Sequence, residues 1–246
     1  MNRLEVLAVE GLPEVHPGDD LAALINSHIT LRGGDVVVVA QKIVSKAEGR
    51  IRRLSEVVAS EDAKRIASRL IAEPDPRMVQ VVLDESVRIV RSERVLITQT
   101  RHGYVCANGG VDHSNVPGGD AVTLLPMDPD ASASKLCAEL RRLSGVQVGV
   151  IVSDTFGRPW RIGIQNVALG IAGVPSVIDL RGTLDDEGKD LHATVLAVAD
   201  DLASAAGIVM GKTARTPVVI VRGFAGEGRT GTGRDMIRPA GEDLFR

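Results

Sequence analysis

The chain has 246 residues, of which 44% are hydrophobic and 25% are charged, and this usage excludes an intrinsically disordered chain. Lys and Arg total 29 against 32 Asp and Glu, so the basic excess that nucleic-acid binding requires is absent. The two cysteines show no metal-binding spacing and favour a reducing, cytoplasmic location. The longest apolar stretch is interrupted by Asp200 and Asp201, so no membrane partner is expected.

Apolar periodicity and turn residues predict the elements in chain order. We expect strands at residues 4–9, 35–40, 87–90, 95–98, 104–107, 146–152, 176–180 and 217–221. We expect helices from 19 to 25, from Ser60 to a stop at Pro74, and over 132–143, 163–172 and 194–206. Residues 87–107 resemble a meander, and helices and strands do not alternate strictly. The sequence therefore predicts the α/β class (mixed α+β), with no linker that fixes a domain boundary.

The most informative segment is SDTFGRPWR at residues 153–161, directly after an apolar strand. The carboxylate of Asp154 and the hydroxyl of Thr155 are hard oxygen ligands that suit Mg²⁺ or Mn²⁺, and ligands commonly bind at the carboxyl ends of such strands. Arg158 and Arg161 are suited to hold a carboxylate or a phosphate. The alternative is that Asp154 caps a turn and both arginines are solvated.

Two further segments carry charge at positions where a ligand would need it. Asp112, among the glycines and amides of residues 108–119, would form a two-carboxylate metal site with Asp154. If residues 42–46 form a helix, Lys42 and Lys46 lie on the same side of it, where they would neutralise a polyphosphate. The alternatives are a surface turn around Asp112 and a solvated basic turn around the lysines.

Two apparent nucleotide motifs are rejected. Residues 207–213 look like a phosphate-binding P-loop, but three residues instead of four separate the glycines and the segment follows a helix. Residues 226–231 satisfy GxGxxG, but the chain ends too soon for the βαβ unit of a dinucleotide site.

Five segments in chain order resemble the coenzyme F420-0:L-glutamate ligase family. They are GLPEV at 11–15, KIVSKAEGR at 42–50, GVDHSNV at 110–116, SDTFGRPWR at 153–161 and VMGK at 209–212. The resemblance implies one ligase domain over residues 1–246, without the flavin-binding half of the bifunctional relatives. It also implies a family-specific ligase fold of mixed sheets and helices, with two subdomains and an intertwined homodimer.

The same resemblance implies an activity. The expected enzyme is a GTP-dependent ligase that joins L-glutamate to the terminal carboxylate of coenzyme F420-0 through an acyl phosphate. Addition of further γ-linked glutamate would give F420-1 and F420-2. The implied cofactors are Mg²⁺ or Mn²⁺, with K⁺ as an additional cation.

Site residues follow by motif from the resemblance. The implied catalytic residues are Asp154, Lys46 and Arg158, and the implied metal ligands are Asp112, Asp154 and Thr155. The implied GTP-binding residues are Gly11, Leu12, Pro13, Glu14, Gln41, Lys46 and Asn115. Gln41 departs from the serine that is frequent in the family, and Gly207 departs from an acidic residue.

Three alternatives to this function remain open. One is a ligase of the same fold that acts on a different carboxylate, since function resides in the site and not in the fold. Another is a non-catalytic nucleotide-binding relative, and the third is an NAD-dependent oxidoreductase.

Overall fold

A five-stranded sheet forms the centre of the computed structural model, which describes residues 3–113, 119–211, 214–226 and 228–243. Its strand order is β1 (Glu5–Ala8), β12 (Val218–Arg222), β2 (Val36–Ala40), β8 (Gly149–Arg158) and β9 (Arg161–Ala172). β2 and β8 pair in parallel, and the other neighbours pair antiparallel. β1, β2 and β8 therefore run in one direction, and their carboxyl ends meet at one edge of the sheet.

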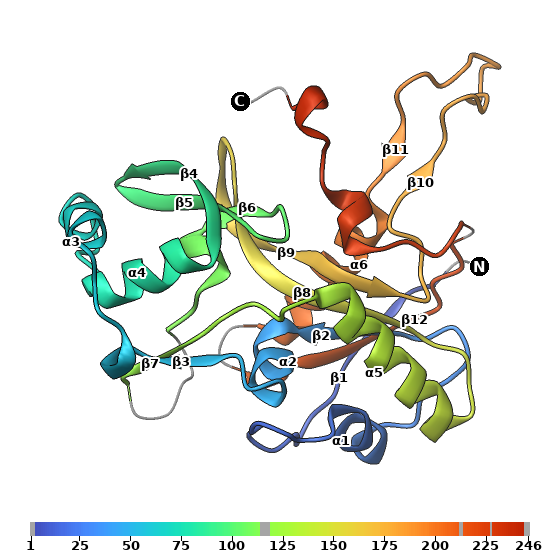
Figure 1. The fold of residues 1–246 in the computed structure, drawn as a ribbon. Helices are drawn as coiled ribbons and strands as arrows, with labels where there is room; N and C mark the ends of the chain where they lie inside the picture. The colour runs from blue at the N-terminus through green and yellow to red at the C-terminus, as the bar shows by residue number, and fades with distance from the viewer. Residues whose placement is uncertain (1–2, 114–118, 212–213, 227, 244–246) are drawn as a thin grey trace.

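Helices cover both faces of this sheet (Figure 1). α1 (Leu21–His28), α2 (Gln41–Ala47) and α5 (Pro129–Ser144) pack on one face, and α6 (Val198–Met210) packs on the other. The valines of β2 are buried because their side chains alternate between the two resulting cores. No helix in the described ranges combines the length and the apolar character that a membrane span requires.

A second lobe lies beside the sheet (Figure 1). It contains α3 (Glu61–Ala67), α4 (Pro76–Asp84), the pair β3 (Ile51–Arg53) and β7 (Ala121–Thr123), and the meander β4 (Ser86–Glu93), β5 (Val95–Thr100) and β6 (Val105–Ala107). Its apolar side chains form a core of their own. A hairpin of β10 (Ile178–Asp179) and β11 (Val195–Leu196) projects from the molecule on the side away from the second lobe (Figure 1). The mixed α/β class and the meander are thus confirmed.

The helix expected at residues 163–172 is wrong, because this segment is the strand β9. β8 also continues to Arg158 instead of ending at residue 152, and the two strands form a long hairpin. The small residues that favoured a helix serve close packing against α5 instead. A Cβ on Gly170 would lie only 1.9 Å from the carbonyl oxygen of Pro129.

Pro76 begins α4, a helix that the sequence analysis missed. The helix that begins after Ser60 already ends at Ala67, and the Asp75 side chain accepts a hydrogen bond from the Arg77 amide to cap the next helix. Proline is well tolerated in the first turn of a helix, so it marks a start here instead of a stop. The last helix also begins at Val198 instead of residue 194.

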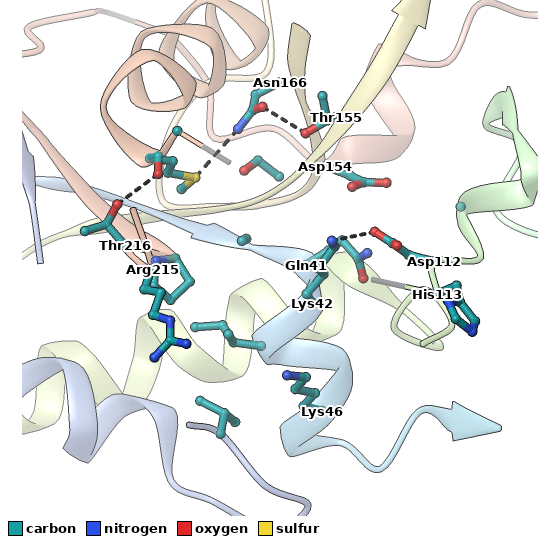
Figure 2. Close-up of a pocket in the computed structure, with 18 of the residues that line it drawn as sticks. Gln41, Lys42, Lys46, Asp112, His113, Asp154, Thr155, Asn166, Arg215 and Thr216 are labelled. Atoms are coloured by element: carbon teal, nitrogen blue, oxygen red, sulfur yellow. Dashed lines mark hydrogen bonds and ion pairs between the residues drawn. The ribbon is translucent and has the colours of Figure 1, made fainter. Parts of the chain in front are cut away.

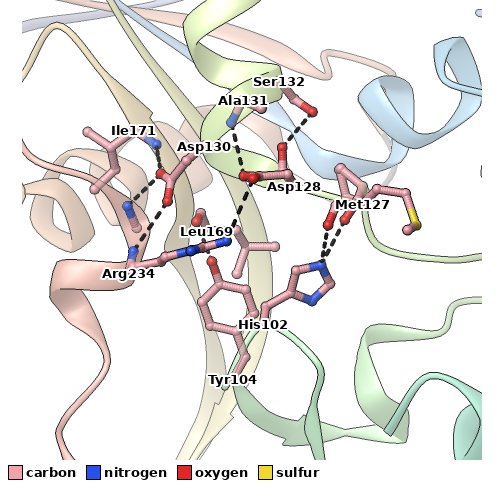
Figure 3. Close-up of polar contacts among 12 residues, drawn as sticks. His102, Tyr104, Met127, Asp128, Asp130, Ala131, Ser132, Leu169, Ile171 and Arg234 are labelled. Atoms are coloured by element: carbon pink, nitrogen blue, oxygen red, sulfur yellow. Dashed lines mark hydrogen bonds and ion pairs between the residues drawn. The ribbon is translucent and has the colours of Figure 1, made fainter.

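Polar contacts join the second lobe to the central sheet (Figure 3). The hydroxyl of Tyr104 donates to the carbonyl of Leu169 on β9. The Nε2 atom of His102 lies 2.9 Å from the carbonyl oxygen of Pro126. Asp130 accepts backbone N–H bonds from Ile171 at 3.0 Å and Gly233 at 2.6 Å. These bonds fix the meander and the C-terminal segment against α5 and β9.

We expect Asp35→Ala to lower the free energy of unfolding by about 3 kcal/mol. The Asp35 side chain is fully buried and accepts two hydrogen bonds from Arg222, both of 2.8 Å. Removing the carboxylate leaves the largely buried guanidinium without its partner. Urea denaturation measures the change, and Asp186→Ala in the exposed hairpin serves as control. Equal midpoints for both variants would contradict the prediction.

Candidate functional site

A cavity of about 1090 Å³ opens at the edge of the sheet where β1 and β2 end and β8 continues beyond its pairing with β2. The segment after β1, the helix α2 and the far half of β8 each supply part of its wall, and the second lobe supplies the opposite wall (Figure 2). Ala40 pairs with Ser153 in register, so Gln41 and Asp154 follow at matching positions. The parallel pairing thus brings together motifs that lie more than a hundred residues apart.

Most of the predicted site residues line this cavity. They are Leu12, Pro13, Glu14, Gln41, Lys42, Lys46, Asp112, Asp154 and Thr155. Gly11 precedes this group in the chain with φ of +78°, a backbone conformation that favours glycine. Asn115 lies outside the described residues.

The two lysines of α2 both face the cavity, as their spacing predicted, and each pairs with a carboxylate. The Nζ atom of Lys42 lies 2.5 Å from Oδ2 of Asp112, and Nζ of Lys46 lies 2.5 Å from Oε1 of Glu14. Lys46 is only 6% exposed, whereas the Glu14 side chain is 57% exposed. The Glu14 carboxylate is therefore in contact with solvent, while the Lys46 side chain is held in a buried position beside the cavity.

Two buried polar atoms in the cavity wall have no hydrogen-bond partner among the described residues. They are Nε2 of Gln41 and Oγ of Ser153. The other end of the Gln41 amide is fixed, because its Oε1 atom accepts a hydrogen bond of 2.9 Å from Ser45. An unsatisfied buried donor costs about 1–3 kcal/mol, and a ligand oxygen in the cavity would remove that cost.

Both cysteines are free and buried, and Cys106 on β6 feels the charge of the Asp154 carboxylate. Burial first, and the Asp154 carboxylate second, raise the pKa of Cys106 to about 12. Burial also raises the pKa of Cys137. Since the thiolate is the reactive form, we expect iodoacetamide at pH 8 to modify neither cysteine in the native protein and both after unfolding in guanidinium. Mass spectrometry counts the adducts, and rapid labelling of the native protein would contradict the prediction.

Arg158 does not line the cavity. Its guanidinium turns into the β8–β9 hairpin, where Nη1 donates to Gln165 at 3.1 Å and Nη2 donates to the carbonyl of Ile162 at 2.9 Å. Its Nε is buried without a partner among the described residues. The catalytic role of Arg158 stays a prediction that these contacts do not support directly.

Several residues of the cavity wall were not predicted from the sequence. Asn166 enters from β9, and Arg215 and Thr216 enter from the segment after α6. The Arg215 side chain has no hydrogen-bond or ion-pair partner in the described part of the chain, and its backbone has φ of +53°. The alternation of β9 would have identified Asn166, had that segment been taken as a strand. Nothing in the sequence alone points to Arg215.

The donor atoms of the predicted metal site fit a hard divalent cation. Asp112 and Asp154 supply carboxylates and Thr155 supplies a hydroxyl, which are the oxygen ligands that Mg²⁺ and Mn²⁺ prefer. Within the described ranges, no three His, Cys, Asp or Glu side chains gather closely enough to hold a metal ion. Three side-chain oxygens would leave coordination positions for oxygen atoms of water or of a substrate, as is usual for Mg²⁺.

Fold and site together define an α/β protein with a cavity at the edge of its central sheet that is lined by both carboxylates and cationic side chains. The sequence model of the family described as F420-0:Gamma-glutamyl ligase matches residues 11–223, and the chain belongs to that family. It is 47% identical to the Coenzyme F420:L-glutamate ligase of Methanopyrus kandleri over the full length of both chains. The ligases of that name from Methanothermobacter thermautotrophicus and Methanocaldococcus jannaschii are 44% and 41% identical, over 99% of this chain and 99% and 97% of theirs.

Proposed function

We propose that this protein is a ligase that uses GTP to form an amide bond between L-glutamate and the terminal carboxylate of coenzyme F420-0. Family membership supports the ligase and its acceptor, because relatives that carry this name match the chain from end to end. The observation that carries the proposal is the cavity, whose lining brings together Lys46, Asp112, Asp154 and Thr155 from three separate motifs.

The proposed reaction has two steps. An oxygen of the F420-0 carboxylate attacks the γ-phosphorus of GTP, and the bond from that phosphorus to the β,γ-bridging oxygen breaks to release GDP. The amine of glutamate then attacks the acyl carbon, phosphate leaves, and the amine loses a proton. Both steps depend on positioning and charge stabilisation, so a nucleophilic side chain is not required.

Different residues of the cavity would stabilise charge, donate a hydrogen bond and bind the metal. Lys46, fixed beside the cavity, would balance the negative charge that develops on the phosphates. The unpartnered Nε2 of Gln41 would donate a hydrogen bond to a phosphate or ribose oxygen. Asp112, Asp154 and Thr155 would hold Mg²⁺ or Mn²⁺, which lowers the charge repulsion between the phosphates and an incoming carboxylate. A requirement for K⁺ is part of the same proposal.

The decisive experiment incubates the purified protein with F420-0, L-glutamate, GTP and Mn²⁺, and follows the coenzyme by mass spectrometry. We expect a mass gain of one glutamyl residue or more, with GDP and phosphate formed in equal number. The count of added residues shows whether F420-1 and F420-2 both form. ATP in place of GTP tests the nucleotide preference, and omission of K⁺ tests that cation.

Failure of this assay would separate the alternatives. GTP hydrolysis without a glutamyl product would point to a ligase with a different carboxylate acceptor. Binding of GTP without turnover under any condition would point to a non-catalytic relative. Binding of NAD(H) in place of GTP would support the oxidoreductase.

We propose further that the protein is a homodimer. The β8–β9 hairpin supports this, because Trp160 and Ile162 at its tip are 82% and 101% exposed and Ile164 is also exposed. Such a concentration of apolar surface commonly marks an interface. Sedimentation equilibrium is expected to give twice the 26.0 kDa of one chain, and Ile162→Asp is expected to shift the mass toward one chain. A monomeric wild-type protein would contradict the proposal.

A further inference from the structure

Asn166 has a polar environment that differs at the two ends of its amide. Thr155 lies directly across from it in the β8–β9 register, and the Thr155 hydroxyl donates a hydrogen bond of 3.1 Å to Oδ1 of Asn166. On the other side, Nδ2 of Asn166 lies 3.6 Å from the sulfur of Met210 (Figure 2). A thioether accepts weakly and never donates. The sulfur therefore favours the NH₂ end, and the carbonyl end is left to face Thr155.

This orientation determines what the Thr155 hydroxyl can do in the cavity. A hydroxyl has one proton and two lone pairs. Because its proton is directed to Asn166, every other contact of the Thr155 oxygen must use a lone pair. An amide turned the other way would donate to the oxygen and leave the hydroxyl proton to point at the cavity, where it would repel a cation.

The packing behind Asn166 keeps the amide in place. Gly207 on α6 lies against it, and a Cβ on Gly207 would approach Cγ of Asn166 to 2.8 Å and Oδ1 to 3.0 Å. The backbone carbonyl of Asn166 also accepts a hydrogen bond of 3.0 Å from Ser204 on the same helix. The missing side chain at Gly207, which the sequence analysis noted as a departure from the family, thus provides room for the amide.

We propose that Asn166 is a positioning residue that holds the proton of Thr155 on its own amide oxygen, so that a lone pair of the Thr155 oxygen is left for the divalent cation. This inference rests on the proposed function, because it presumes that Thr155 binds the metal. It assigns no contact between Asn166 and a substrate. Its effect should therefore appear in metal affinity before it appears in the chemistry.

Titration of the free protein with Mn²⁺ tests the inference, because the electron paramagnetic resonance signal of aqueous Mn²⁺ falls on binding. We expect Asn166→Ala to weaken Mn²⁺ binding about 10-fold or more, the range found when a residue that orients a metal ligand is removed. Asn166→Asp, which keeps an acceptor for the Thr155 proton, should retain the affinity. The double variant Thr155→Val/Asn166→Ala should bind no more weakly than Thr155→Val alone.

Two more variants separate positioning from stability. Gly207→Ala leaves Asn166 in the chain but displaces its amide, and it should weaken Mn²⁺ binding even though alanine favours a helix interior by up to about 1 kcal/mol. Gln165→Ala is the matched control, because Gln165 is the neighbouring amide on β9 and bonds to Ser204 and Arg158 instead of Thr155. It should leave Mn²⁺ affinity unchanged.

The outcomes distinguish the inference from the proposed function. If the wild-type protein binds no Mn²⁺, the metal site itself is wrong and the inference falls with it. If the wild-type protein binds Mn²⁺ and Asn166→Ala binds it equally well, the inference alone is overturned. Equal losses in Asn166→Ala and Gln165→Ala would also overturn it, because they would reflect a general disturbance of β9.

Discussion

Asp154→Asn is expected to lower kcat/KM of the ligase reaction about 10³-fold while the free energy of unfolding changes by less than about 1 kcal/mol. The replacement is nearly isosteric, and the residue stays in the β8–β9 ladder opposite Val167. What disappears is one of the two carboxylate charges that Asp112 and Asp154 present to the cavity. Turnover by mass spectrometry and thermal unfolding measure the two quantities.

A charge change elsewhere provides the control for this variant. Asp201→Asn on α6 makes the same chemical change at an exposed position that does not line the cavity, and near wild-type activity is expected. Near-normal turnover of Asp154→Asn would remove Asp154 from the metal site. A variant that loses both its activity and its cooperative unfolding would assign the carboxylate a structural role instead.

The sequence pointed to Asp154, which the structure places in the cavity wall, because the signal at the end of an apolar run is local. Its role in metal binding stays a prediction. An apolar run that meets a carboxylate and a hydroxyl points to the edge of a sheet, and Ser153 is the last residue of β8 that pairs with β2, so Asp154 and Thr155 lie just beyond that edge. The lysine spacing in α2 was informative for the same reason, since residues four apart share one side of a helix. In each case a few adjacent residues contained the whole signal.

Tertiary packing decided the elements that the sequence did not predict. β9 has small residues because α5 passes close to Gly170, and that proximity depends on residues far away in the chain. With β9 taken as a helix, the alternation that turns Asn166 toward Thr155 was hidden. The position of Arg215 in the cavity wall depends on the path that the chain takes after α6, and the local sequence has no periodicity that predicts this path. Long-range contacts, and not weak local signals, set this limit.

Lys46→Met is expected to lower kcat/KM about 10²- to 10³-fold, mainly by raising the KM for GTP. The Lys46 side chain is almost fully buried and its partner Glu14 is exposed, so a phosphate that enters the cavity would compete with Glu14 for the ammonium. Methionine keeps most of the side-chain volume, so the loss reports the charge and not a cavity. Steady-state kinetics with varied GTP measures the effect.

A conservative replacement distinguishes a positioned charge from charge alone. Lys46→Arg is expected to fail to restore activity, because a planar guanidinium is larger than an ammonium and the site leaves Lys46 only 6% exposed. Lys64→Met, which removes the same charge from an exposed position on α3, should keep wild-type kinetics. If Lys46→Arg restores full activity, any cation near the phosphates suffices. If Lys46→Met leaves the KM for GTP unchanged, the fixed ammonium does not contact the nucleotide, and Arg215 becomes the side chain to replace next.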